Sequence, residues 1–488
     1  MGIVRKQSID NMLVTYLGFG IGAVNVLFLY TNFMSDTYYG LIQVMLSAAL
    51  ILMPLMAFGV PNTLVKFYSS FQDQNQKEGF LTLMLLFPLL LIIPIGLLSY
   101  FANEAIGTFL ARENPEVKGY VWYIFWIGFA MAYFEVFYAW TRVHLKSVFG
   151  NFMKEVFCRV GQTVLLVLLY FDSIDVSFFL KALVVLYLAR TLIMKGYAYH
   201  LHRPRLKVVR TLPNWKIFSY SLIIILGGST AIILLEIDKV MLNHYVQIEN
   251  VAYYSVAGFM ASAVGVPGRA MHQITYPLTA KLLNEKDFFA LKRLYQKSAL
   301  TLFVISGLLF VLLLSNLNDL YLLLPDTYGG AWFIVFWIGM AKVSDAVLGN
   351  NNAILYNSDY YRAVLFMGMG LALLTIVFNL WLIPEYGIKG AAIASFMAFL
   401  LYNTIKLLFV WRTYGMLPFT VNMGKVLAVL FFLLLLFQYV RPNLPPLVNI
   451  AIKTVLMGGF YFGVVYRLNV SEDISAVIGS IFRRIKKE

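Results

Sequence analysis

The sequence predicts an all-α polytopic membrane protein, and three observations lead to that class. Apolar residues make up 60% of the 488 residues and charged residues only 13%, against about 45–50% and about 25% in an ordinary soluble domain. A soluble fold of this composition could not cover its surface. The apolar residues also form continuous runs, such as 81–98 and 427–437, whereas a transmembrane β-barrel needs alternating residues. The spanning elements are therefore expected to be helices.

Allowing about 20 apolar residues per crossing and a dozen or so per connection, the chain accommodates about 14 spans. Hydropathy and turn residues place them at 11–33, 40–61, 80–102, 120–140, 157–172, 178–199, 217–236, 251–275, 299–324, 331–348, 363–384, 389–411, 425–440 and 445–466. The first span is expected to be retained, because no small-residue cleavage site follows it.

The formal net charge is +14, and membrane orientation explains it without nucleic acid. With both termini in the cytoplasm, the inside segments carry several times more Arg and Lys than the outside loops, as the positive-inside rule requires. The chain is therefore expected to be a multi-pass protein of the cytoplasmic membrane. Cys158 is the only cysteine, which excludes an intrachain disulfide and a cysteine metal cluster.

An internal repeat predicts two pseudosymmetric six-helix bundles around a central cavity. The sequence Phe-Trp-Ile-Gly at 125–128 recurs at 336–339, and Tyr38-Tyr39 recurs as Tyr253-Tyr254. Six spans separate each copy from its partner, so the halves have the same orientation, an arrangement found in carriers. The predicted parts are an N-terminal lobe (1–200), a C-terminal lobe (211–411), two further spans (425–466) and a basic amphipathic cytoplasmic tail (467–488). A second amphipathic segment, 276–298, is expected to form a helix along the membrane surface.

Charged residues inside spans are costly and call for a partner, a wet cavity or an exit to the interface. Arg269 lies eight residues before Pro277, about 12 Å by helical rise, which is too deep for a loop residue. Its guanidinium suits a diphosphate, because the planar fork donates in pairs and stays protonated. A snorkelling side chain or a structural ion pair is the alternative. His272 follows three residues later on the same face, as a second substrate-binding candidate or a structural residue.

Lys342 and Asp345 are spaced for an intrahelical ion pair. Either the pair holds the helix in place, or Asp345 exchanges Lys342 for Na⁺ or H⁺ and couples transport to an ion gradient. Glu135 falls at nearly the same level of the first half and joins this group. Arg190 and Asn25, both within spans, complete the substrate-binding candidates, although Asn25 also suits a helix-joining hydrogen bond.

Three other intramembrane lysines are expected to snorkel to the interface: Lys181, Lys406 and Lys453. Walker A, HExxH and GxSxG motifs and Cys/His ligand clusters are absent from the sequence. The chain is therefore not expected to be an enzyme or to need a cofactor, and an ion or substrate gradient would supply the energy.

Two passages and a short turn resemble a known family. Asp238 to Leu242 and then residues 250–257 are similar to its "D…L…G-x-Y-S-x-A" passage, with Ala252 in place of the usual Gly. Residues 379–395 are similar to its "N-x-x-L-I-P-x-Y-G-x-x-G-A-A-x-A-T/S" signature, and Tyr38-Tyr39-Gly40 fits its first outer turn. The chain thus resembles the multidrug/oligosaccharidyl-lipid/polysaccharide exporter superfamily, in particular its bacterial polysaccharide flippases.

This resemblance implies a flippase that moves undecaprenyl-diphosphate-linked oligosaccharide across the bacterial cytoplasmic membrane by alternating access. It implies lipid-linked oligosaccharide and membrane lipids as partners, Na⁺ or H⁺ as coupling ions, and a polysaccharide polymerase or glycosyltransferase nearby. Arg269 is the residue to which the diphosphate-binding role would carry over. A cation-coupled multidrug exporter of the same fold and a non-transporting scaffold for polysaccharide synthesis remain the alternatives.

Overall fold

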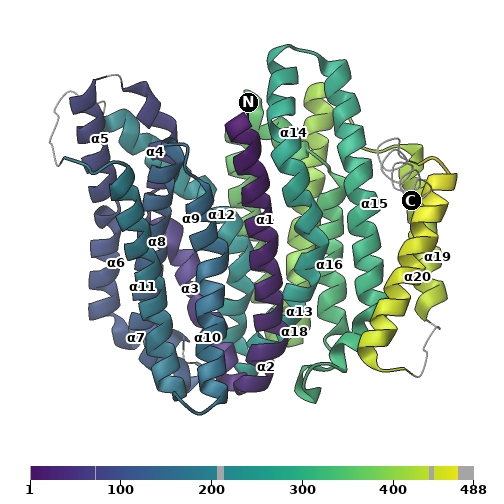
Figure 1. The fold of residues 1–488 in the computed structure, drawn as a ribbon, viewed down its shortest axis with the longest axis horizontal. Coiled ribbons are helices and arrows are strands. Elements are labelled where there is room, and N and C mark those ends of the chain that lie inside the picture. Colours follow the sequence, from purple (N-terminus) through teal and green to yellow (C-terminus); the bar gives the residue numbers. More distant parts are fainter. Residues whose placement is uncertain (1, 72, 111, 206–213, 439–443, 471–488) are drawn as a thin grey trace. The chain divides into compact units, whose positions relative to one another are not determined.

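Helices lie over each of the fourteen segments that hydropathy predicts (Figure 1). The structure is a computed structural model that describes residues 2–71, 73–110, 112–205, 214–438 and 444–470. Within these ranges it contains no β-strand. The predicted all-α class is therefore confirmed.

The chain divides into two compact units, Met1–Ser255 with Asn379–Ile388, and Val256–Phe378 with Lys389–Glu488. The elements of the first unit are α1 (Gly2–Val24), η1 (Asn25–Leu29), α2 (Tyr30–Phe33), α3 (Asp36–Met56), α4 (Val60–Phe67), η2 (Tyr68–Ser70), α5 (Gln74–Leu86), α6 (Leu89–Phe101), α7 (Asn103–Leu110), η3 (Pro115–Tyr120), α8 (Val121–Val143), α9 (Val148–Phe152), η4 (Met153–Phe157), α10 (Cys158–Tyr170), α11 (Val176–Leu201) and α12 (Asn214–Tyr245). Helix α13 (Glu249–Ser262) begins in this unit and continues into the next.

The second unit continues with η5 (Ala263–Gly265), α14 (Val266–Asn284), α15 (Phe288–Tyr321), η6 (Asp326–Tyr328), α16 (Trp332–Val347), α17 (Asn351–Asn357), α18 (Tyr361–Tyr414), α19 (Val421–Gln438) and α20 (Pro446–Arg467). Nine of the described helical stretches are long and apolar enough to cross a membrane, and a tenth forms if the bent pair α16 and α17 counts as one span. Helix α18 covers two predicted spans in one 54-residue stretch. The chain is a multi-pass helical membrane protein, and fourteen crossings stay a prediction.

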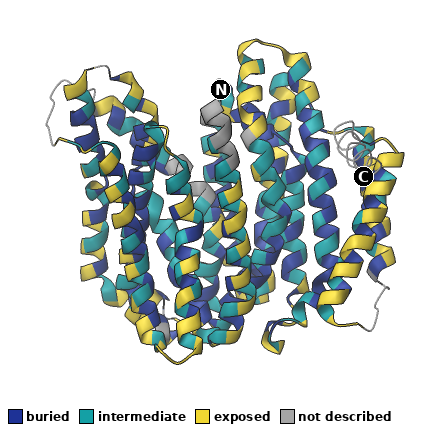
Figure 2. Cartoon of the chain, in the orientation of Figure 1, coloured by how far each residue is buried: buried dark blue, intermediate teal, exposed yellow. Residues whose placement is uncertain are grey.

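In the first unit, α8 packs against α11, α3 and α4, and α12 packs against α3 (Figure 1). Aromatic side chains fill this core, and Trp140 and Phe134 of α8 are fully buried. In the second unit, α15 has the central place and packs against α14, α16, α19 and α20. Exposed residues are frequent along α6 and α20 (Figure 2). They include the apolar Leu97 and Val455, as expected where lipid replaces water.

Glycine explains the break within α18. Gly387 has φ 55° and ψ −132°, a backbone conformation that is open essentially to glycine alone. The predicted division between the spans 363–384 and 389–411 falls at this residue. The turn from one helical segment to the next therefore explains why the "P-x-Y-G" passage has a glycine at this position.

Two expectations, one about a basic segment and one about a single lysine, are wrong. Residues 276–298 do not form one helix, because α14 ends at Asn284 and α15 begins at Phe288, with a turn between them in which Lys286 has φ 55°. Lys453 does not snorkel, because it forms a buried ion pair with Asp319 of α15 at 2.6 Å. Of the predicted tail, residues 471–488 lie outside the described part of the chain.

Candidate functional site

Polar side chains gather between α14, α16, α17 and α18 in the second unit. Spacing puts Arg269, His272 and Tyr276 on one face of α14, since residues three, four and seven apart lie above one another. His272 interacts electrostatically with Asp345 of α16 and Lys406 of α18, so this face of α14 is turned toward those helices.

Lys406 is the buried cation of this group. Its side chain is 1% exposed, and its Nζ donates to Asn352 Oδ1 at 3.1 Å and lies 3.4 Å from Asp345 Oδ1. The ammonium also lies 4.4 Å from the centre of the Tyr402 ring, where a cation–π interaction stabilises it. The expectation that Lys406 snorkels to the interface is therefore wrong. A carboxylate, an amide and an aromatic ring compensate the burial of its charge.

Asp345 is the carboxylate of the same group, and its side chain is 40% exposed. It contacts Lys406, sixty-one residues away in the sequence. Lys342, the partner predicted from the spacing, has its Nζ 4.9 Å from the centre of the Phe399 ring. Its stem also lies 3.6 Å from the position of a Cβ atom on Gly265, just before α14. Lys342 therefore belongs to the same group.

Arg269 is exposed. Among the residues that the structure describes, none forms a hydrogen bond or an ion pair with its guanidinium. The group thus brings together His272, Lys342 and Asp345, three of the seven predicted site residues, and adds Lys406. A fourth, Arg269, lies on the same face of α14 as His272. Cations outnumber carboxylates in it, so the arrangement favours an anionic ligand.

The other three predicted residues lie in the first unit. Glu135 of α8 forms an ion pair with Lys154 of the π-helical turn η4 at 2.6 Å. Arg190 of α11 is 6% exposed, and its guanidinium lies 4.1 Å from the centre of the Phe134 ring and 4.9 Å from that of Tyr187. Its Nε has no hydrogen-bond partner in the described part of the chain.

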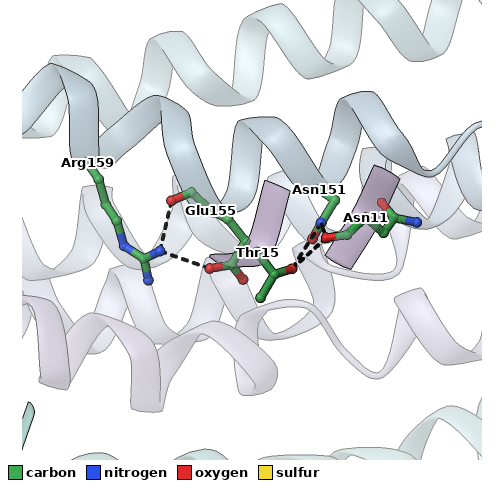
Figure 3. Close-up of polar contacts among 5 residues, drawn as sticks. All are labelled: Asn11, Thr15, Asn151, Glu155 and Arg159. Carbon is green, nitrogen blue, oxygen red and sulfur yellow. Dashed lines mark hydrogen bonds and ion pairs between the residues drawn. The ribbon is translucent and has the colours of Figure 1, made fainter. Parts of the chain in front are cut away.

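A polar seam joins α1 to α9, η4 and α10 (Figure 3). Asn151 Nδ2 donates to the Asn11 carbonyl oxygen at 3.0 Å and to Thr15 Oγ1 at 3.2 Å. Further along, Arg159 Nη1 lies 3.1 Å from Glu155 Oε2. A Cβ atom on Gly18 would lie 2.6 Å from the Glu155 carbonyl oxygen. Only a glycine therefore allows α1 to pack this closely against η4.

Asn25 begins the π-helical turn η1 and is buried at the same seam. Its Nδ2 donates to the Arg159 carbonyl oxygen at 2.8 Å, and its Oδ1 accepts from Thr163 Oγ1 at 2.7 Å. These bonds join two helices, the alternative that the sequence left open for this residue. Its role in substrate binding stays a prediction.

The residues that carry the family resemblance meet in one network of the first unit. Asp238 of α12 is buried and accepts hydrogen bonds from Tyr254 Oη at 2.6 Å and from Asn379 Nδ2 at 2.7 Å. These residues come from both passages of the resemblance. Gly40 of the first outer turn lies against the Ile248 carbonyl oxygen, and a Cβ atom would collide with it. The motif residues thus have a packing and hydrogen-bonding role.

Sequence reasoning missed Lys154, Asn352 and the Glu155–Arg159 pair. The last has a local signal, the spacing of four residues in a helix, although Glu155 lies outside the predicted span 157–172. Lys154 and Asn352 have no such signal, because their partners lie on other helices. No group of three or more His, Cys, Asp or Glu side chains that could hold a metal occurs in the described residues.

Comparison with solved structures gives the fold. The chain is similar to the lipid II flippase MurJ in an inward closed conformation, with 13% identity, a TM-score of 0.72, and coverage of 95% of this chain and 100% of that one. It is also similar to an inward-facing multidrug resistance MATE family transporter of the MOP superfamily, with 15% identity, a TM-score of 0.61, and coverage of 85% and 96%. A MOP superfamily transporter from Pyrococcus furiosus matches with 15% identity, a TM-score of 0.51, and coverage of 86% and 94%.

No curated protein matches the sequence. The family model for polysaccharide biosynthesis proteins matches residues 4–283, more than half of the chain. This match includes the passage at 238–257 and, together with the MOP fold, confirms the resemblance to the superfamily. The chain belongs to the polysaccharide biosynthesis protein family.

Proposed function

We propose that this protein is a flippase that moves an undecaprenyl-diphosphate-linked oligosaccharide from the inner to the outer leaflet of the bacterial cytoplasmic membrane. Transport would proceed by alternating access and would supply cell-surface polysaccharide synthesis. Membership of the polysaccharide biosynthesis family supports the glycan. The likeness to a flippase of lipid II supports a lipid-linked substrate.

The observation that carries the proposal is the exposed Arg269 on the face of α14 that also carries His272, which interacts with Asp345 and Lys406. A diphosphate bears negative charge that must be compensated inside a membrane protein. A guanidinium compensates it with two parallel hydrogen bonds, which makes Arg269 the principal diphosphate ligand. A carrier of cationic drugs would need more carboxylates here than Asp345 alone. Arg190 and Asn25 of the first unit complete the proposed substrate contacts.

Ion coupling would use Asp345, with Lys342 and with Glu135 of the first unit. Asp345 is half-exposed and already shares a cation, Lys406, so Na⁺ or H⁺ can compete with the lysine for its oxygens. Exchange of one cation for another would change the packing of α16 against α18. This step would couple a gradient to the movement of the substrate.

The proposal also places both termini in the cytoplasm and the chain in the inner membrane, from the distribution of Arg and Lys along the sequence. A polymerase or glycosyltransferase of the same pathway would be its partner, since it would make or use the translocated glycan.

Flipping of a fluorescent polyprenyl-diphosphate oligosaccharide in proteoliposomes tests the function. Arg269→Ala should reduce the initial rate at least tenfold, because the diphosphate loses its ligand. Arg269→Lys should retain part of the rate, since the charge remains but the fork is lost. Arg412→Ala, which changes an exposed arginine at the end of α18, is the matched control and should leave the rate unchanged.

An Arg269→Ala protein that flips at the wild-type rate would contradict the proposed ligand. A wild type that moves no lipid-linked glycan but extrudes a cationic dye would favour the multidrug exporter instead. If neither occurs, and the variants still support polysaccharide synthesis in cells, the protein is a scaffold.

The coupling role has its own test. With Asp345→Asn, the flipping rate should no longer depend on a Na⁺ or pH gradient, because the neutral amide cannot exchange cations. This variant leaves Lys406 buried without its carboxylate, so the double variant Asp345→Asn, Lys406→Met serves as the control for folding. Undiminished gradient dependence in both variants would exclude Asp345 as the coupling residue.

A further inference from the structure

Three tyrosines stand beside the proposed diphosphate ligands in the second unit: Tyr276 of α14, Tyr356 of α17 and Tyr402 of α18. The phenol of Tyr356 interacts electrostatically with that of Tyr276 and with that of Tyr402. Tyr402 in turn interacts with Asp345 and covers the Lys406 ammonium. Tyr356 lies one helical turn from Asn352, which binds Lys406, and Tyr276 lies one turn from His272. We call these three residues the tyrosine cluster.

Two of the three tyrosines are exposed, although the cluster borders the buried Lys406. Tyr276 is 38% exposed and Tyr356 is 46% exposed. Tyr276 lies on the same face of α14 as Arg269 and His272. The exposed apolar residues Ile274 and Leu278 lie on the opposite face. Asp345, a half-exposed carboxylate beside the same cluster, requires polar surroundings there and not acyl chains.

Asn352 gives the cluster a directed polar group. Its Oδ1 accepts the hydrogen bond from Lys406, which orients the amide and leaves its Nδ2 as a donor that has no partner among the described residues. The tyrosine hydroxyls add further donors and acceptors. Aromatic faces with a few fixed polar groups are the usual composition of a small-molecule site.

We propose that Tyr276, Tyr356, Tyr402 and Asn352 form the subsite for the first sugars of the oligosaccharide. A pyranose ring presents a face of C–H groups that packs on an aromatic ring, while its hydroxyls require hydrogen-bond partners such as the Asn352 amide and the phenols. The class of ligand is therefore a hexopyranose with an unobstructed C–H face. The inference rests on the proposed function, and it adds a glycan site that is separate from the diphosphate ligand.

The geometry along α14 fits such a ligand. Arg269 and Tyr276 are seven residues apart on one face, which corresponds to about 10 Å along the helix axis. A diphosphate bound at Arg269 would therefore place the sugars attached to it beside the tyrosine cluster. Because Tyr276 lies toward the end of α14 that the sequence predicts to be cytoplasmic, the glycan would enter from the side where it is made.

Binding of free glycans to the purified full-length protein tests the subsite without a lipid or a diphosphate. The probe is a panel of immobilised oligosaccharides that includes neutral hexose trisaccharides. Tyr356→Ala and Tyr276→Ala should lower apparent affinity for the bound glycans at least tenfold, whereas Tyr356→Phe should lower it less than threefold because the ring remains.

Tyr100→Ala is the matched control, since Tyr100 is an exposed tyrosine of α6 in the first unit. Size-exclusion profiles and melting temperatures show which variants fold. The subsite is refuted if the folded wild type binds no glycan on the panel, or if Tyr356→Ala and Tyr276→Ala bind like Tyr100→Ala. Glycan binding in a protein that flips no lipid would retain the subsite and reject the flippase, so the two proposals fail separately.

Discussion

The ion pair of Asp319 and Lys453 is buried on both sides, with side-chain exposures of 9% and 5%. Asn449 of α20 donates a further hydrogen bond to Asp319 Oδ1 at 3.2 Å. Replacing Lys453 alone by Met should destabilise the protein by about 3–5 kcal/mol, because a buried carboxylate loses its counter-charge. The double variant Asp319→Asn, Lys453→Met should recover much of that loss. Thermal unfolding of the detergent-solubilised proteins compares them, and a double variant no more stable than the single one would show that charge pairing is not the cause.

The sequence predicts which site residues share a helix face, but not which residues of different helices are paired. Arg269 and His272 could be placed together because helical spacing is a local signal. Lys406 and Lys453 could not be distinguished from snorkelling side chains, since their partners lie 61 and 134 residues away. Whether a membrane lysine is buried depends on which helices pack together, and hydropathy contains no information about that pairing.

At the scale of elements, the break in α18 depends on one glycine. Gly387→Ala should destabilise the protein by about 1–3 kcal/mol, because an L-residue is strained at this φ and ψ. Gly370→Ala in the same element is the matched control, since a Cβ atom there meets no other atom within 4 Å. That change should be neutral or stabilising by up to about 1 kcal/mol. Melting temperatures decide the matter, and equal effects of the two substitutions would contradict a special role for Gly387.

Helix positions followed from hydropathy, whereas departures from regular helix did not. Two such departures are the π-helical turns η1 (Asn25–Leu29) and η4 (Met153–Phe157). Each adds a residue to a turn without changing composition, so a count of apolar residues does not reveal it. The turn at 285–287 was missed for a similar reason, because the basic amphipathic pattern continues through it. The amphipathic pattern of 276–298 is continuous in the sequence, but in the structure a turn divides it between α14 and α15.

For the whole molecule, the internal sequence repeat predicts parallel halves, on which the proposed alternating access depends. Both copies of Phe-Trp-Ile-Gly lie in helices, α8 and α16. Parallel halves require an even number of crossings between the copies, so equivalent loops must open on the same side of the membrane. The sidedness of loops is therefore a direct test of the predicted architecture, and it needs no knowledge of the substrate.

Cysteine labelling in intact cells can measure that sidedness, because Cys158 is the only cysteine and is buried. In a Cys158→Ala background, Ser173→Cys and Thr327→Cys should react with a membrane-impermeant maleimide from outside, since both positions are exposed in predicted outer loops. Lys146→Cys and Lys286→Cys, exposed in predicted inner loops, should react only after permeabilisation. The Cys158→Ala parent controls for background labelling. Outside labelling at residue 146 or 286 would show that the spans before it have been miscounted, and the parallel halves on which alternating access rests would then be wrong.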